Sequence, residues 1–307
     1  MNKKLPIIID TDPGIDDAIA LIMLYKYIDM FDVKLICAVG GNISLDITTK
    51  NVQHIAKKFF NGVKIAQGLG EPLYKKLPYS EEEVHGFGGL GNYDIGGEQD
   101  YPYETDAVKA MYDVLMNSEE KITLVTLGPM IDVGKLLRDY PEVKDKIEKI
   151  YSMIGSIGGI GNVPQAPWAE FNAYIDPDAF KIVVDSGIPM VINPFEVGND
   201  SRIKKQLFKD MESKSQTQDM IKLMVEGIYE RKDPSCISIF DLNTTYGLIR
   251  PDLYELIPCD IEVCDSSSEK EGKCVLTKNP SGKHCYQVIK DIEKCNSEIM
   301  KDLFSIM

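Results

Sequence analysis

Four aspartates lie within eight residues near the start of the chain, between two apolar runs. The segment reads IIIDTDPGIDDAIAL (7–21), and its acids are Asp10, Asp12, Asp16 and Asp17. Carboxylates crowded together at a partly buried place repel one another, so some of them would take up a proton. A bound divalent cation removes this conflict. The segment therefore predicts a metal site, because the tight turn at Pro13-Gly14 aims three of the carboxylates the same way.

Further polar segments follow the other predicted strands. They are Asn42 after the strand at 33–39, the TLGP segment at 126–129, and Asn162 and Glu170-Phe171-Asn172 after the strand at 149–155. In an open parallel sheet, ligands bind beyond the carboxyl ends of the strands, so we expect these positions to meet at one edge. Oxygen donors suit Ca²⁺. Zinc is disfavoured, since none of the three histidines has the spacing of zinc ligands.

The elements that must position these residues alternate between strand and helix. Strands are predicted at 5–9, 33–39, 63–66, 121–127, 149–155 and 188–193, and weaker ones at 260–264, 273–277 and 285–289. Helices are predicted at 16–28, 105–117, 131–139, 215–231, 241–249 and 291–305, and two more begin at caps formed by Asp46 and Asp176. Residues 68–103 lack periodicity, which is typical of a functional loop. The alternation predicts one α/β domain over 1–307, with a mostly parallel open sheet flanked by helices (Rossmann-like) and an active site at the C-terminal ends of the strands.

Composition narrows the class of protein and of partner. The 307 residues are 44% hydrophobic and carry a net charge of −14, which disfavours nucleic acid and anionic membranes as partners. No apolar run approaches the roughly 20 residues of a transmembrane helix, and the run before Asp10 is too short for a secretory signal. The seven cysteines, five of them after residue 255, match no metal-binding spacing. They predict free thiols and a cytoplasmic location.

Several candidate residues also have ordinary structural explanations. Asp16 and Asp17 could be first-turn acids that the helix dipole favours. His85 lies in the glycine-rich segment VHGFGGLGN (84–92), whose glycines allow the backbone to approach a ligand, so a packing role and a binding role stay open. The single tryptophan, Trp168, is open between core packing and stacking on a ligand ring.

The segment DTDPGIDDAIAL (10–21) resembles the signature of the nucleoside hydrolase family, the inosine-uridine-preferring type. Five more segments look like family blocks in the right order: AVGGN (38–42), VHGFGGLG (84–91), TLGP (126–129), GNVPQAPWAEFN (161–172) and FDLNTTYGLIRPDLY (240–254). The resemblance covers most of residues 5–255. It implies Ca²⁺-dependent hydrolysis of the N-glycosidic bond of small-molecule ribonucleosides, which gives free base and ribose, by a homodimer or homotetramer.

The resemblance implies a role for each residue of this chain that matches a motif position of the family. The ligands of Ca²⁺ would be Asp12, Asp17, the Leu127 carbonyl oxygen and Asp241. The catalytic residues would be Asp12, which takes the proton of the attacking water, and Asn172. Ribose hydroxyls would be held by Asp16 and Asn172 with Asn42 nearby, and the 5′-hydroxyl end by Asn162 and Glu170, next to Phe171.

Two positions depart from the family pattern. Phe240 stands where members that cleave purine and uridine nucleosides often have a histidine, proposed to protonate the departing base. The candidates left near the base are His85 and Tyr229 as acids, and Trp168 or Phe87 as a stacking ring. The chain also has Ile131-Asp132 where a Thr-Asn pair is usual. The preferred base stays open.

Three other classes of protein are weighed against this one. A phosphatase of the haloacid dehalogenase type also begins with a strand and DxD, but Gly14 stands where it usually has Thr or Val. A dinucleotide-binding oxidoreductase would need GxGxxG after the first strand, which is absent. A non-catalytic Ca²⁺-dependent ribose- or nucleoside-binding protein would keep the metal and sugar residues, and Phe240 leaves that alternative open.

Overall fold

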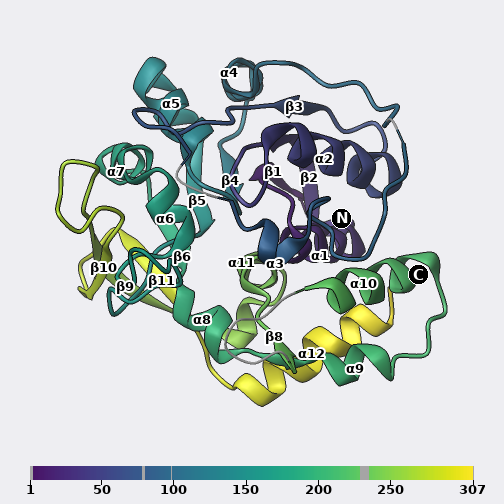
Figure 1. The fold of residues 1–307 in the computed structure, drawn as a ribbon. Coiled ribbons are helices and arrows are strands. Elements are labelled where there is room, and N and C mark those ends of the chain that lie inside the picture. The colour runs from purple at the N-terminus through teal and green to yellow at the C-terminus, as the bar shows by residue number, and fades with distance from the viewer. Residues whose placement is uncertain (1–2, 78–79, 98, 229–234, 307) are drawn as a thin grey trace.

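A central sheet organises the computed structural model, which describes residues 3–77, 80–97, 99–228 and 235–306. Within these residues the strand order is β10-β9-β11-β6-β5-β4-β1-β2-β3 (Figure 1). The strands are β1 (Leu5–Thr11), β2 (Phe31–Ala38), β3 (Ile65–Gln67), β4 (Ile122–Thr126), β5 (Ile147–Met153), β6 (Met190–Asn193), β9 (Tyr254–Val263), β10 (Cys274–Lys278) and β11 (His284–Ile289). All neighbours from β11 to β3 pair in parallel, and only β9 and β10 add antiparallel pairings at one edge. The predicted mostly parallel open sheet is confirmed.

Helices cover both faces of the sheet (Figure 1). The longer ones are α1 (Ile15–Lys26), α2 (Leu45–Phe59), α4 (Ala107–Asn117), α5 (Ile131–Asp139), α7 (Pro177–Asp185), α10 (Gln216–Gly227), α11 (Phe240–Ile249) and α12 (Ile292–Phe304). The short ones are α3 (Glu82–His85), α6 (Phe171–Ile175), α8 (Phe195–Asp200) and α9 (Lys205–Lys209), with 3-10 turns at Ile28–Met30, Pro141–Lys146 and Pro251–Leu253. Among the described residues, no helix has the length and apolar character needed to cross a bilayer.

The two faces of the sheet carry separate cores, and β1 contributes to both. Ile7 and Ile9 belong to the core formed with α1, α2, α10, α11 and α12, whereas Ile8 belongs to the core formed with α4, α5 and α7. Successive side chains of a strand point to opposite faces. A parallel strand covered by helices on both sides therefore reads as an unbroken apolar run, as LPIII does.

The structure corrects some predicted elements. Asp46 does not cap its helix, because Ser44 occupies the N-cap position and Asp46 lies in the first turn of α2. Asp176 does cap α7, since it accepts a hydrogen bond from the Ala179 backbone N–H at 2.9 Å. The short helices α3, α6, α8 and α9 and the two-stranded sheet of β7 (Ile203–Lys204) and β8 (Cys236–Ile237) were not predicted, because such short elements show no periodicity. All seven cysteines are free thiols, as expected.

Candidate active site

The turn between β1 and α1 holds the acidic segment in place. The strand ends at Thr11 and the helix begins at Ile15. Asp17 closes the turn, because its Oδ1 accepts a hydrogen bond from Thr11 Oγ1 at 2.5 Å and its Oδ2 accepts one from the Gly14 backbone N–H at 3.1 Å. A Cβ on Gly14 would lie 2.6 Å from His85 Nδ1. Only glycine therefore allows this turn and the segment around His85 to approach so closely.

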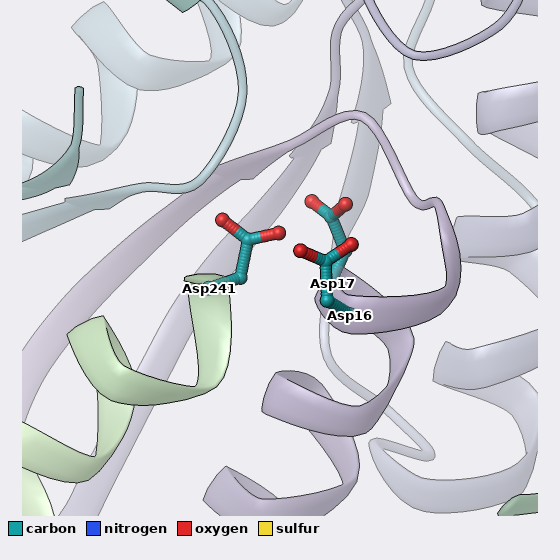
Figure 2. Close-up of side chains that lie close together, drawn as sticks. All are labelled: Asp16, Asp17 and Asp241. Atoms are coloured by element: carbon teal, nitrogen blue, oxygen red, sulfur yellow. The ribbon is translucent and has the colours of Figure 1, made fainter. Parts of the chain in front are cut away.

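Asp241, distant in sequence, joins the aspartates of this turn. It lies in the first turn of α11, which packs beside α1. One carboxylate oxygen from each of Asp16, Asp17 and Asp241 lies within 4.8 Å of the other two. Figure 2 shows the Asp241 carboxylate turned toward Asp16 and Asp17. Burial, followed by the charge of Asp17, raises the pKa of Asp241 well above its usual range.

Asp12 lies beside this group and is 1% exposed. Its Oδ2 accepts a hydrogen bond from the Asn42 backbone N–H at 2.7 Å, whereas its Oδ1 has no hydrogen-bond partner among the described residues. Two glycines surround it: a Cβ on Gly41 would lie 2.2 Å from Oδ2, and one on Gly128 would lie 2.5 Å from Oδ1. Burial and the charge of Asp17 raise the pKa of Asp12 well above its usual range. The site thus holds a buried carboxylate with one unused acceptor oxygen.

Asn172 connects the end of β4 to the end of β5. Its side-chain N–H₂ group donates to the Leu127 carbonyl oxygen at 2.7 Å and to the Met153 carbonyl oxygen at 2.9 Å. Both amide hydrogens are then used, so the amide oxygen is what Asn172 can offer to a ligand. The Leu127 carbonyl oxygen keeps a second lone pair for another donor or a cation.

Glu170 is buried and caps α6. Its Oε1 accepts a hydrogen bond from the Asn172 backbone N–H at 2.9 Å, and its Oε2 accepts from Gly155 at 2.8 Å and Ala173 at 3.2 Å. Burial raises the pKa of Glu170 to about 7, against the lowering effect of these backbone donors. Asn162 supports the same segment by accepting from the Phe171 backbone N–H at 2.9 Å.

A cavity of about 310 Å³ brings most of the predicted site residues together. Those that line it are Asp16, Asn42, His85, Leu127, Asn162, Glu170, Phe171, Asn172 and Asp241. Asp12 and Asp17 are not lining residues, and both are almost fully buried. Small-molecule sites of this size are concave and combine apolar walls with a few convergent polar groups.

Two predicted binding residues have other positions. Trp168 does not line the cavity, and its indole N–H donates to the Glu271 carbonyl oxygen at 3.1 Å. Its ring packs, partly buried, against the apolar cluster that includes Phe171, which is the first of the two roles considered for it, and ligand stacking by Trp168 stays a prediction. Tyr229 lies outside the described residues. His85 lines the cavity, and its Nδ1 accepts from the Ile15 backbone N–H at 3.1 Å, so the ring proton of the neutral side chain is on Nε2.

Other cavity residues were not predicted from the sequence. They include Glu81, Val84, Met153, Phe195, Asn199, Arg202, Ile228 and Ser238. Two of them, Phe195 and Asn199, lie four residues apart on α8, which is the spacing of one helix face, whereas Arg202 follows the end of that helix. That spacing was the available signal, but it is short and lies in a segment for which no helix was predicted.

Phe240 forms part of the cavity wall and is firmly seated there. Its ring stacks on Phe195 with centroids 5.6 Å apart and an angle of 15° between the planes. A Cβ on Gly198 would lie 2.1 Å from Phe240 Cδ1, so glycine makes room for this ring. The next residue in the chain is Asp241, so an apolar and an acidic side chain are adjacent in the cavity wall.

The donor set of the acid cluster fits a divalent cation. Asp12 Oδ1 and Asp241 Oδ1 are buried oxygens without hydrogen-bond partners among the described residues. Buried polar atoms are rarely left unpaired, and a cation would satisfy both while it offsets the repulsion between the acids. All available donors are oxygens, which suits a hard ion such as Ca²⁺.

A second buried pair of acids lies beneath this site. Asp10 on β1 and Asp132 in the first turn of α5 are both buried, and Asp132 Oδ1 accepts from the Leu69 backbone N–H at 2.9 Å. Asp132 Oδ2 and both carboxylate oxygens of Asp10 have no partner among the described residues. Burial raises the pKa of Asp132 to about 7 and that of Asp10 well above its usual range, the latter with a contribution from the charge of Asp132.

The sheet is mostly parallel, and an acid-lined cavity lies at the carboxyl ends of its strands. This arrangement is typical of an enzyme that acts on a small polar molecule. The family model described as inosine-uridine preferring nucleoside hydrolase matches residues 7–302, and the chain belongs to this family. The resemblance read from the sequence motifs is thereby confirmed.

Individual relatives agree with this assignment. The chain is 34% identical over 276 residues to the non-specific ribonucleoside hydrolase RihC of Salmonella typhimurium, which covers 90% of this chain and 89% of the relative. It is 35% identical over 273 residues to the RihC protein of Klebsiella pneumoniae, with 89% and 88% covered. Two solved structures share the fold: the plant nucleoside hydrolase PpNRh1 (TM-score 0.88, 23% identity, 99% and 100% covered) and a purine-preferring ribonucleoside hydrolase from Gardnerella vaginalis (TM-score 0.86, 22% identity, 98% of each chain).

Proposed function

We propose that this protein hydrolyses the N-glycosidic bond of ribonucleosides to free base and ribose, with Ca²⁺ bound at the acid cluster. The observation that carries the proposal is the meeting of Asp16, Asp241 and Asn172 on one cavity, with the buried Asp12 close enough to Asp16 and Asp17 for their charges to act on it. The names of the RihC relatives, which are non-specific ribonucleoside hydrolases, support the same substrate class.

The proposed ligands of the ion are Asp12, Asp17, Asp241 and the Leu127 carbonyl oxygen. Asp16 also lies within reach of Asp17 and Asp241. We assign Asp16 to the substrate by its position in the family motif, and its place on the cavity wall, where Asp12 and Asp17 do not lie, supports this assignment. When bound, the ion lowers the pKa of a water molecule at the site and holds it for attack.

The protein's own residues then carry the reaction. The buried Asp12 carboxylate accepts a proton from the attacking water. The water oxygen bonds to C1′ of the ribose while the bond to the base nitrogen breaks, and the base leaves with the bonding electron pair. The sugar passes through an oxocarbenium-like state, whose positive charge the nearby carboxylates stabilise.

Ribose recognition is assigned to groups that accept hydrogen bonds. The Asp16 carboxylate and the Asn172 amide oxygen would accept from the 2′- and 3′-hydroxyls, with Asn42 nearby. Asn162 and Glu170 would hold the 5′-hydroxyl end, next to Phe171. These assignments are supported by the position of all six residues on the cavity.

The test is release of ribose from a panel of ribonucleosides, measured with Ca²⁺ and again after treatment with a chelator that removes it. We expect ribose and free base in equal amounts with Ca²⁺, and loss of both without it. The non-catalytic alternative gives a different result: nucleosides raise the temperature of thermal unfolding, but no ribose appears.

We also propose that residues 1–307 form a single nucleoside hydrolase domain that assembles as a cytoplasmic homodimer or homotetramer. Strands from both ends of the chain in one sheet support the single domain, and seven free thiols suit a reducing compartment. Sedimentation of the purified protein measures the assembly, and a monomer at all concentrations would contradict it.

A further inference from the structure

One wall of the cavity has no role in the reaction described above. It is formed by α8 and by the two-stranded sheet of β7 and β8, and it carries Phe195, Asn199, Arg202 and Ser238. The acids assigned to the ion and the ribose come from other elements, namely the β1–α1 turn and α11. If the ribose occupies the acidic end, the base faces the wall that remains.

The pairing of β7 with β8 positions Arg202 in this wall. Ile203 lies opposite Ile237 in the antiparallel pair, and Arg202 and Ser238 are the next residues of the chain beyond this pair. The chain around Arg202 is anchored, because Asn243 donates to Ser201 Oγ at 2.8 Å and Asn296 donates to the Arg202 carbonyl oxygen at 3.4 Å. Arg202 is half-buried and lines the cavity together with Ser238.

The charge of Arg202 distinguishes it from the other lining groups. Among the described lining residues it is the only lysine or arginine, whereas Asp16, Glu81, Glu170 and Asp241 are acids. A guanidinium is always protonated, only donates hydrogen bonds, and desolvates more easily than an ammonium. A partly buried cation beside apolar rings is suited to a group that becomes negative during the reaction.

The departing base is such a group. When the N-glycosidic bond breaks, its electron pair goes to the base, and in bases with an oxo group the charge spreads onto that oxygen. A base must be protonated or its charge stabilised before it leaves readily. Phe240 cannot supply a proton, and its stacking on Phe195 leaves this wall apolar apart from Arg202, Asn199 and Ser238.

We propose that Arg202 donates hydrogen bonds to the oxo group of the base and stabilises its negative charge as it departs, so that the substrates are ribonucleosides of oxo bases. This inference rests on the proposed hydrolysis of ribonucleosides. Inosine and uridine present an oxygen that accepts from the guanidinium. Adenosine presents an amino group at the corresponding position, so a donor would face a donor.

The experiment compares kcat/KM of the full-length enzyme with Ca²⁺ on inosine, uridine, adenosine and p-nitrophenyl riboside. The variants are Arg202→Gln, which removes the charge, and Arg202→Lys, which keeps it. Arg138→Gln is the matched control, because Arg138 is on α5 and pairs with Asp139 outside the cavity. The nitrophenyl substrate is the internal control, since its leaving group departs without help.

We expect Arg202→Gln to lose about 10- to 100-fold on inosine and uridine and less than about 3-fold on the nitrophenyl riboside. Arg202→Lys should recover part of the loss, Arg138→Gln should match wild type, and the preference for inosine over adenosine should shrink in Arg202→Gln. A merely structural role would lower all four substrates together and would overturn the inference, as would unchanged activity. If wild type releases no ribose from any substrate, the proposed function itself fails and the inference falls with it.

Discussion

The ring of Phe240 stacks on the ring of Phe195, with their centroids 5.6 Å apart and their planes at 15°. This contact fixes a phenyl group in the cavity wall next to Asp241, at a position where related enzymes often have a histidine. A phenyl ring can close the wall and exclude water, but it cannot donate a proton. The first prediction concerns this position.

We expect Phe240→His to raise kcat on inosine and uridine by about 10-fold or more, because general acid assistance typically contributes about 10²–10⁴-fold. The kcat on p-nitrophenyl riboside should change little, since the nitrophenolate leaves without a proton. In wild type the nitrophenyl riboside should be cleaved faster than inosine. Phe240→Leu serves as the control for loss of the ring. Equal rates on inosine and the nitrophenyl riboside in wild type would mean that leaving-group catalysis is already efficient.

The cation site is tested by Asp17→Asn. Ca²⁺ should raise the temperature of thermal unfolding of wild type, because a ligand that binds only the folded state stabilises it. This rise and ribose release should both be lost in Asp17→Asn, while circular dichroism shows an intact fold. Asp46→Asn, an exposed first-turn change on α2, is the control and should behave as wild type. Full activity of metal-free Asp17→Asn protein would refute the assignment.

Recognition of the ribose hydroxyls predicts a strong preference against 2′-deoxynucleosides. A site built to bond a hydroxyl rejects the analogue without it by up to about 10⁴-fold, since its buried polar groups are left unpaired. We expect kcat/KM for inosine to exceed that for 2′-deoxyinosine by about 10³–10⁴-fold, and Asp16→Asn to reduce this ratio. Comparable values for the two nucleosides would contradict the roles given to Asp16 and Asn172.

The buried acid Asp132 predicts a pH dependence of stability. Its pKa is about 7 in the folded protein and about 4 in an unfolded chain, so between these pH values the folded state binds more protons. The free energy of unfolding therefore falls as pH rises from about 4 to about 7, and Asp132→Asn removes that loss. We expect the variant to be more stable than wild type by about 1–3 kcal/mol at pH 8 and similar to it at pH 4.

Urea unfolding at the two pH values measures this difference. The asparagine keeps an oxygen that can accept from the Leu69 backbone N–H, so the contact to that loop is preserved. Asp145→Asn is the control, because Asp145 is exposed and its substitution should not change the pH dependence. A variant less stable than wild type at pH 8 would show that the carboxylate of Asp132 is itself stabilising.

The sequence by itself determined the parallel sheet, the family and most of the acidic end of the site. Buried strands and the glycine turn after β1 can be predicted because they are local features. A short unbroken apolar run is typical of a parallel strand covered on both faces, and Pro13-Gly14 is typical of a tight turn. The resemblance to family motifs then singled out Asp12, Asp16 and Asn172 as candidates, and the structure places Asp16 and Asn172 on one cavity.

Only the tertiary structure decided what each side chain faces. The packing of α11 beside α1 brought Asp241 to Asp16, and the pairing of β7 with β8 brought Arg202 to Ser238. Neither contact has a local signature, because the partners are distant in sequence and the elements around Arg202 are too short to show periodicity. Trp168 is a further example. Its place beside the AEFN motif left core packing and ligand stacking open, and only the folded chain shows that its indole N–H bonds the Glu271 carbonyl oxygen, which is distant in sequence.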